Sequence, residues 1–233
     1  MKLLRLTLIA SAASLALGGA ALAETIKPTW SINGAVTSNY VFRGVSQVGA
    51  YDPAVQGGID IGLGPVYVGA WASNVKFGDG TDAEVDVYGG VKPSISGFNF
   101  DLGIIGYLYP GAPAADDVPY VEFKGAVSHA LGPATIGAAI YYSPDFTFTP
   151  GVSANGTYYE GNASIPINSK ISLSGAVGHQ HVSKGFTSYT TWNAGATFTI
   201  IPHVSIDARY WDTDQVGKIF GPRGVVTLKF TYP

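Results

Sequence analysis

Short segments that alternate between apolar and polar residues make up most of this chain, and they are the feature that most constrains its fold. Segment 30–43 is the clearest, because Asn33 belongs to its polar parity and its apolar parity includes Trp30, Ile32, Val36, Tyr40 and Phe42. Side chains alternate across a β-strand, so each such segment has one apolar and one polar face. The pattern predicts an all-β chain in which the two faces of the sheet meet different environments.

The connections between these segments indicate how the strands are arranged. Gly64-Pro65, Gly132-Pro133, Asn168-Ser169 and Pro202-His203 are very short turns, 93–97 is slightly longer, and the connections between them are longer and polar. Transmembrane β-barrels have short periplasmic turns and longer outer loops. Only helices and closed barrels satisfy their backbone within a bilayer. The sequence therefore predicts an antiparallel up-and-down transmembrane β-barrel of about 12 strands, with both termini in the periplasm.

The N-terminal residues have the pattern of a secretory signal. Lys2 and Arg5 precede a small-residue apolar stretch, which ends in the A-x-A-like sequence 21–23. We expect a cleaved signal peptide at 1–23 and one barrel domain at 24–233, located in the outer membrane of a Gram-negative bacterium. No later run approaches the roughly 18 apolar residues of a spanning helix. The chain has no cysteine, so disulfides cannot stabilise it.

Composition favours a membrane barrel over a soluble sandwich or a lipocalin-like barrel. Charged residues are 12% of the chain, about half the usual quarter. A soluble protein would also have to hide the apolar stripes of all its strands in one core, while their other faces collect charged groups. The net charge of −3 does not point to nucleic acid. Aromatic residues near strand ends are predicted to form the interfacial girdles; they are Trp30, Tyr40, Tyr142, Tyr159, Trp192, Tyr210 and Tyr232.

The polar faces supply the candidate functional residues. The predicted pore-lining residues are Arg43, Asp60, Glu84, Asp86, Asp101, Glu122, Lys124, Glu160, Asp207, Arg209 and Lys229, and Lys92 shares their face. Acidic residues slightly outnumber basic ones, which predicts at most a weak preference for cations. These charges could instead pair across the lumen and brace it. Since 12 strands lie between a filled and a water-filled barrel, a narrow pore and a barrel plugged by a folded-in loop both stay open. Segment 66–77 is apolar on both faces and has no assigned side.

Evidence for catalysis in the sequence is weak. His181, Ser183 and Asn193 supply the residue types of a lipid-acting outer-membrane hydrolase, but the strand register places Asn193 on the opposite face from His181. A nucleophile, its base and the orienting group must lie within hydrogen-bond reach. His179 and His181 have no further ligand cluster to complete a metal site. We therefore predict no catalytic residues, no cofactor and no metal.

Several strings of this sequence resemble the TorF-like family of outer-membrane porins. They are Ser38-Asn39-Tyr40-Val41-Phe42-Arg43-Gly44-Val45-Ser46-Gln47, Asp52-Pro53-Ala54-Val55-Gln56-Gly57-Gly58, Trp71-Ala72-Ser73-Asn74-Val75, Glu84-Val85-Asp86-Val87-Tyr88-Gly89-Gly90, 107–111 and Tyr141-Tyr142-Ser143-Pro144-Asp145. The resemblance is dense over residues 29–146 and looser beyond them. It implies an outer-membrane barrel that acts as a porin, with no catalytic or binding residues to carry over.

The predicted function is passive diffusion of ions or small hydrophilic solutes through the barrel. The expected partners are the outer-membrane bilayer, the solutes themselves and the barrel-assembly machinery, and a homo-oligomer is possible. A non-conducting barrel that serves as a surface adhesin or structural protein is the alternative of a different class. The lipid-acting hydrolase is a third hypothesis, and it predicts activity that Ser183→Ala abolishes.

Overall fold

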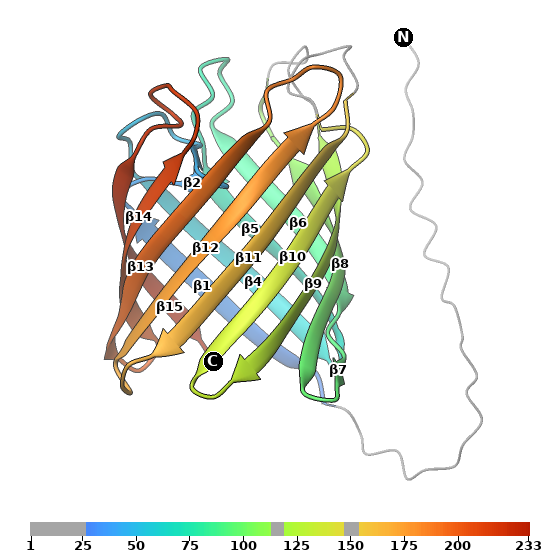
Figure 1. The fold of residues 1–233 in the computed structure, drawn as a ribbon, viewed down its shortest axis with the longest axis vertical. Helices are drawn as coiled ribbons and strands as arrows, with labels where there is room; N and C mark the ends of the chain where they lie inside the picture. The colour runs from blue at the N-terminus through green and yellow to red at the C-terminus, as the bar shows by residue number, and fades with distance from the viewer. Residues whose placement is uncertain (1–26, 113–118, 147–153) are drawn as a thin grey trace, which may run out of the picture.

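Twelve long strands form the body of the protein in the computed structural model, which describes residues 27–112, 119–146 and 154–233 (Figure 1). The predicted signal at 1–23 lies outside this range. The long strands are β1 (Thr29–Thr37), β4 (Ala54–Leu63), β5 (Val66–Asn74), β6 (Ala83–Val91), β8 (Phe98–Leu108), β9 (Tyr120–Leu131), β10 (Ala134–Ser143), β11 (Gly156–Pro166), β12 (Ile171–Val182), β13 (Tyr189–Ile201), β14 (Val204–Thr213) and β15 (Arg223–Tyr232). Three two-residue strands are β2 (Val41–Phe42), β3 (Val45–Ser46) and β7 (Ser94–Ile95). Within the described part of the chain, no helix is long and apolar enough to cross a membrane.

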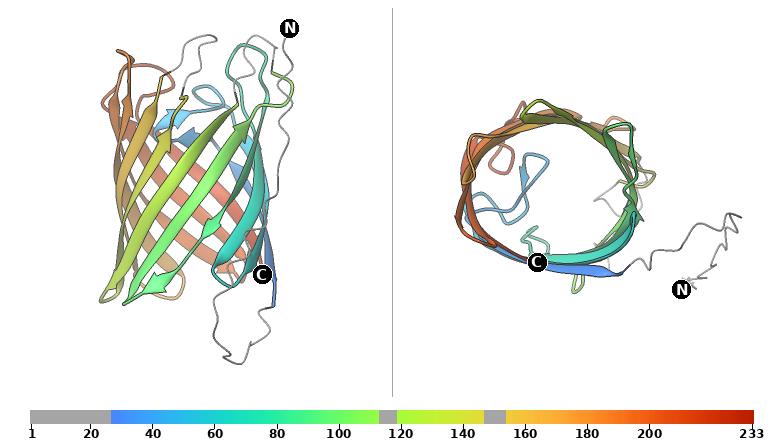
Figure 2. Two further views of the ribbon diagram at one scale, coloured as in Figure 1. Left: turned by 90° about the vertical axis from the view of Figure 1, so that its right-hand side faces the viewer. Right: turned by 90° about the horizontal axis from the view of Figure 1, so that it is seen from below.

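The sheet closes on itself. Each long strand pairs antiparallel with the next one in the chain, and β1 pairs antiparallel with β15, from Ile32 opposite Tyr232 to Thr37 opposite Thr227. Seen along its axis in Figure 2, the sheet is a continuous ring. A closed barrel leaves no strand edge unpaired. The prediction of a 12-stranded up-and-down barrel is confirmed.

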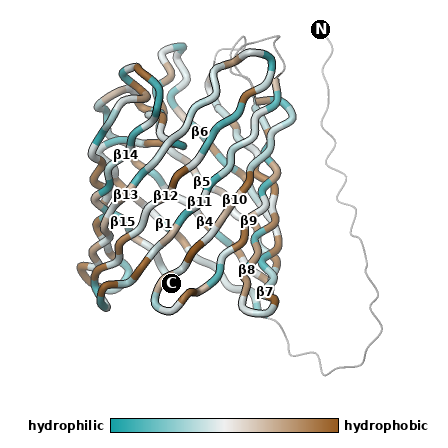
Figure 3. The backbone as a smooth tube through the Cα atoms, viewed as in Figure 1, coloured by the Kyte–Doolittle hydropathy of each residue, from teal (hydrophilic) through white to brown (hydrophobic). Residues whose placement is uncertain are grey.

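The outer surface of the barrel carries the apolar parity of every strand. Val36, Val55 and Val177 each keep more than half of their side chain exposed, and the apolar positions recur along the strands in Figure 3. The previously unassigned segment 66–77 is also settled, since Val66 and Val68 are exposed on the outside. This outer apolar surface is what a barrel needs in order to face lipid rather than water.

The connections separate the two ends of the barrel. Turns at 64–65, 92–97, 132–133, 167–170 and 202–203 lie at one end, together with Thr29 and Tyr232; we call it the short-turn end. The longer connections lie at the other, the long-loop end (Figure 1). The predicted alternation of short and long connections is confirmed. Which end faces the periplasm stays a prediction.

The first segment does not run as one strand from Trp30 to Arg43, and that prediction is wrong. β1 ends at Thr37, whose hydroxyl donates to the carbonyl of Asn39 (2.9 Å). The chain then turns into the barrel, where β2 and β3 form a small hairpin inside the ring in Figure 2. We call residues 41–46 the lumen hairpin. Tyr40 therefore does not belong to the outer aromatic girdle, whereas the other six predicted girdle residues are exposed.

A two-residue turn forms the tip of the lumen hairpin. Arg43 (φ 49°) and Gly44 (φ 83°) both lie in the left-handed region between the paired residues Phe42 and Val45. Two successive positive φ values are the mark of the type I′ turn, which suits the twist of a hairpin. Left-handed backbone costs a non-glycine residue roughly 1–2 kcal/mol. Contacts made by the Arg43 side chain must offset that cost.

Glycines inside the barrel leave room for tyrosine rings on neighbouring strands. A Cβ atom at Gly178 would overlap the hydroxyl and the ring of Tyr158 on the adjacent strand β11. Gly161 lies in the same hairpin, and a Cβ there would meet nothing within 4 Å. The two positions therefore form a matched pair for testing how tightly the lumen side chains are packed.

We expect Gly178→Ala to destabilise the barrel and Gly161→Ala to leave it nearly unchanged. The added methyl group at 178 must displace the Tyr158 ring, and overpacking of this kind costs about 1–3 kcal/mol. The midpoint temperature of unfolding, followed by the gel-mobility shift of heated protein, should fall only for Gly178→Ala. Equal midpoints for the two variants would contradict this packing.

Candidate functional site

The tip of the lumen hairpin is fixed to the opposite wall by Arg43. Its Nη1 and Nη2 donate to the two carboxylate oxygens of Glu122 on β9, both at 2.7 Å, and Nη1 also donates to Oε1 of Gln180 on β12 at 3.2 Å. The three residues keep 8%, 1% and 1% of their surface exposed. A bidentate arginine–carboxylate pair is the strongest and most directional ion pair available to side chains.

Aromatic rings surround the same guanidinium. Its central carbon lies 4.6 Å from the ring centre of Phe42, 4.8 Å from that of Tyr141 and 4.4 Å from that of Tyr158. A cation near an aromatic face gains up to about 2 kcal/mol when it is desolvated. Because Tyr141 and Tyr158 belong to β10 and β11, diametrically across the ring from β1 and β4, the hairpin crosses the whole lumen.

Further contacts hold the base and sides of the hairpin. The hydroxyl of Tyr40 donates to Oε1 of Glu84 on β6 (2.7 Å), and the amide of Ser46 donates to the carbonyl of Ile219 in the β14–β15 loop (2.9 Å). Gly44 packs so closely against Thr191 that a Cβ atom would not fit. The hairpin is therefore attached to several separate parts of the barrel wall.

The hairpin divides the lumen into two cavities. A cavity of about 550 Å³ lies toward the short turns, and one of about 630 Å³ lies among the long loops; we call them the short-turn cavity and the long-loop cavity. Phe42 of the hairpin and Tyr107 of β8 line both, with ring centres 6.0 Å apart. The alternative of a barrel partly plugged by a folded-in loop is thus the one that the structure shows.

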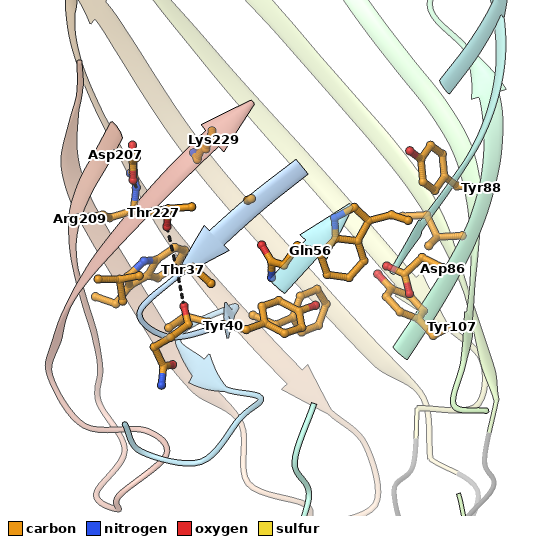
Figure 4. Close-up of a pocket in the computed structure, with 18 of the residues that line it drawn as sticks. Thr37, Tyr40, Gln56, Asp86, Tyr88, Tyr107, Asp207, Arg209, Thr227 and Lys229 are labelled. Carbon is orange, nitrogen blue, oxygen red and sulfur yellow. Dashed lines mark hydrogen bonds and ion pairs between the residues drawn. The ribbon is translucent and has the colours of Figure 1, made fainter. Parts of the chain in front are cut away.

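Charges in the short-turn cavity lie on facing walls. Asp207 and Arg209 of β14 and Lys229 of β15 lie on one side, and Asp86 of β6 lies on the other (Figure 4). Asp207 accepts from Arg209 (3.1 Å) and from Thr197. One carboxylate oxygen of Asp86, in contrast, is buried and has no hydrogen-bond partner among the described residues. The two walls of this cavity therefore carry different charged groups.

The other predicted pore-lining residues also lie on the inner face. Asp60 accepts from the Tyr88 hydroxyl (2.7 Å), Asp101 pairs with Lys124 (2.6 Å), and Glu160 accepts from Tyr158 (3.2 Å). Several of these charges therefore brace the barrel. The set is not one cluster. Glu84, Asp86 and Glu122 come together near the hairpin, and the rest spread along the lumen. Arg43 is the exception, since it belongs to the hairpin and not to the wall.

Two charged groups lie at the rim of the long-loop cavity. Lys76 is paired with Asp52 (2.8 Å), and this contact raises the pKa of the Lys76 ammonium. The carboxylate of Asp79 accepts from the amide of Thr81 (2.8 Å), which lowers the pKa of that carboxyl. Both groups are therefore charged at neutral pH.

Residues 23–231 match the model of a family described as a bacterial protein of unknown function, Gcw_chp. The chain belongs to the Gcw_chp family. The match spans the residues of the whole barrel, including those of the lumen hairpin. A TorF-like name is not among the matches, and that part of the resemblance stays a prediction. No curated protein matches the sequence.

Solved structures similar to this Gcw_chp chain are outer-membrane barrels. The NanC porin superposes with a TM-score of 0.59 at 10% identity, covering 88% of this chain and all of its own. The KdgM porin gives 0.58 at 11% identity, over 87% and 99%. The COG4313 outer membrane channel from Pseudomonas putida F1 gives 0.55 at 10% identity, over 86% and 94%. At such identities the likeness establishes the fold.

The hydrolase residues do not converge in this member of the Gcw_chp family. Nδ1 of His181 lies 3.2 Å from the hydroxyl of Ser188, and Ser183 instead accepts from the amide of Asn155. Asn193 accepts from Arg209 in the lumen. The described residues contain no group of three or more potential metal ligands. The separation of His181 from Asn193 agrees with the expectation from strand register.

Sequence reasoning missed the partners of Arg43. No sequence pattern marks Gln180 as a partner of Arg43. Tyr141 and Tyr158 do not stand out either, because the chain has 14 tyrosines. Arg43-Gly44 itself was a usable signal, because a residue followed by glycine between two alternating runs is a hairpin turn. Tyr40 and Phe42 continue the apolar parity of β1, so residues 40–43 look like a continuation of that strand and not like the start of a hairpin.

Proposed function

We propose that this protein is an outer-membrane pore for ions and small hydrophilic solutes, narrowed by the lumen hairpin. The observation that carries the proposal is the pair of cavities inside a closed barrel, separated by one hairpin that is held by side chains. The porin and channel folds that superpose on the chain support it. The loop end then faces the exterior, and the termini lie in the periplasm.

Export follows the route expected for such barrels. Residues 1–23 act as a signal peptide that is cleaved after Ala23, and the barrel-assembly machinery inserts residues 24–233. Sequencing the N-terminus of protein from outer-membrane fractions tests this directly. A mature chain that begins at Glu24 supports the assignment, and an intact Met1 in the same fraction contradicts it.

Ion selectivity is set where the hairpin crosses the lumen. Glu84, Asp86 and Glu122 surround this level, and Arg43 is the positive charge opposite them. Rings of charge at the narrowest part of a pore decide which ions pass. Three carboxylates against one guanidinium give a modest preference for cations.

Planar-bilayer recording across a KCl gradient tests the proposal. Refolded protein should give discrete conductance steps and a reversal potential on the cation side. A bilayer that stays silent with demonstrably folded, heat-modifiable protein would overturn the pore and favour the non-conducting barrel.

Asp86→Asn should shift the reversal potential toward zero. Since one carboxylate oxygen of Asp86 has no hydrogen-bond partner in the described part of the chain, the amide removes charge and little bonding. Glu160→Gln is the matched control, because Glu160 lies on the inner face but lines neither cavity. The same shift in both variants would place the selectivity elsewhere.

A further inference from the structure

Aromatic residues are the largest group among the side chains that line the long-loop cavity. Its volume of about 630 Å³ falls within the range of small-molecule sites. Phe77 and Tyr109 meet edge to face at 5.5 Å, and Tyr189 and Phe220 at 5.7 Å. The rings that line it come from strands as well as loops, among them Tyr107 of β8, Phe146 of the β10–β11 loop and Phe186 of the β12–β13 loop. Such a surface favours ligands that contact rings.

Glu84 lies in the lining of this aromatic cavity. It is 3% exposed, and it accepts a hydrogen bond from the Tyr40 hydroxyl, a neutral donor. Within the described ranges Glu84 makes no ion pair. The lysine that lines the same cavity, Lys76, is paired with Asp52 and is 69% exposed at the rim. A buried carboxylate without a cation is costly, so a positive ligand would be stabilised there.

The lumen already holds one organic cation in this kind of environment. The Arg43 guanidinium lies against three aromatic rings and pairs with the buried Glu122. The long-loop cavity repeats both components, rings and a buried carboxylate, but no side chain of the described residues supplies the cation to Glu84. We propose that this cavity binds small organic cations, such as alkylammonium or guanidinium compounds, with Glu84 as the counter-ion.

The position of Glu84 connects the cavity to the pore. Glu84 and Asp86 are two residues apart on the inner face of β6, and Asp86 lines the short-turn cavity. A cation that leaves Glu84 therefore meets Asp86 next, beside the hairpin. The inference deepens the pore function proposed above and depends on it for the passage of the ligand, but not for its binding.

Calorimetry on the refolded full barrel in octyl glucoside, a detergent without a choline group, tests binding. The probes are choline and its uncharged analogue 3,3-dimethylbutan-1-ol, in which carbon replaces the ammonium nitrogen. Choline should bind saturably and the alcohol at least about 10-fold more weakly, since aromatic and carboxylate contacts to a desolvated cation exceed the roughly 1.4 kcal/mol of a tenfold difference. Glu84→Gln should weaken choline binding by about 10-fold or more, and Glu160→Gln should leave it unchanged.

Phe77→Leu gives a second test that does not disturb the barrel wall. Phe77 lies in a loop and is 38% exposed, so the variant should fold. Loss of its ring should weaken choline and leave the alcohol nearly unaffected. Equal affinity for both probes, or wild-type choline affinity in Glu84→Gln and Phe77→Leu, overturns the proposal. If the barrel binds choline but is silent in bilayers, the binding site is supported and the pore function is overturned. If the barrel conducts but does not bind choline, the pore function is supported and the binding site is overturned.

Discussion

A barrel that lacks the lumen hairpin should conduct several-fold better than the native protein. The amide of Gln47 donates to the carbonyl of Tyr40 (2.8 Å), so the hairpin is already closed at its base. Two glycines in place of residues 41–46 can therefore reconnect the loop. The deletion joins cavities of about 550 and 630 Å³ into one continuous lumen. Conductance follows the narrowest section of a pore, and this change removes the segment that crosses it.

Single-channel recording in symmetric KCl measures the effect. Lys218→Ala is a suitable control, because Lys218 is exposed in the β14–β15 loop and lines neither cavity. Its conductance should match that of the native barrel. If the shortened barrel is folded and heat-modifiable yet has the native conductance, the hairpin is not the constriction.

Arg43→Ala should release the hairpin from the wall without shortening the chain. Removal of one partner from a buried ion pair costs about 3–5 kcal/mol, because the other charge is left uncompensated. That corresponds to roughly 2 to 4 orders of magnitude in the equilibrium between attached and released hairpin. Glu122 would then lose its cation and keep the hydrogen bond from the Tyr107 hydroxyl, which donates to it at 3.0 Å. We expect the variant to switch between the native conductance level and the higher level of the deletion.

A double-mutant cycle assigns this effect to the pair itself. Arg43→Ala with Glu122→Ala should recover part of the native behaviour, since neither charge is then left alone. Arg43→Lys keeps the charge but not the bidentate geometry, so an intermediate frequency of switching is expected. Recordings of Arg43→Ala that match the native trace would show that the other contacts, such as that of Tyr40 with Glu84, suffice to hold the hairpin.

The two variants change the lumen hairpin in different ways. The deletion removes the hairpin from the lumen, whereas Arg43→Ala keeps the hairpin and changes only the fraction of time that it is attached to the barrel wall. A high steady conductance in the first case and switching in the second would together identify the hairpin as a restrained segment. A high steady conductance in both would mean that Arg43 alone keeps the hairpin in place.

The sequence by itself determined the wall of the barrel. Strand parity is local, because each residue's side follows from its neighbours two positions away. It correctly placed Trp30 and Val36 outside and Glu122 and Lys124 inside. The lengths of the turns at 64–65 and 132–133 are equally local, and they established the up-and-down order and the common end of both termini.

Only the tertiary structure decided what lies inside that wall. Arg43 and Glu122 are 79 residues apart, and their pairing depends on which strands face each other once the ring has closed. Alternation cannot distinguish an apolar residue that faces outward from one that packs on lumen rings, so Tyr40 and Phe42 were wrongly assigned to the outer face. The cavity around Glu84 arises in the same way, because its rings come from strands and loops that are brought together only when the barrel closes.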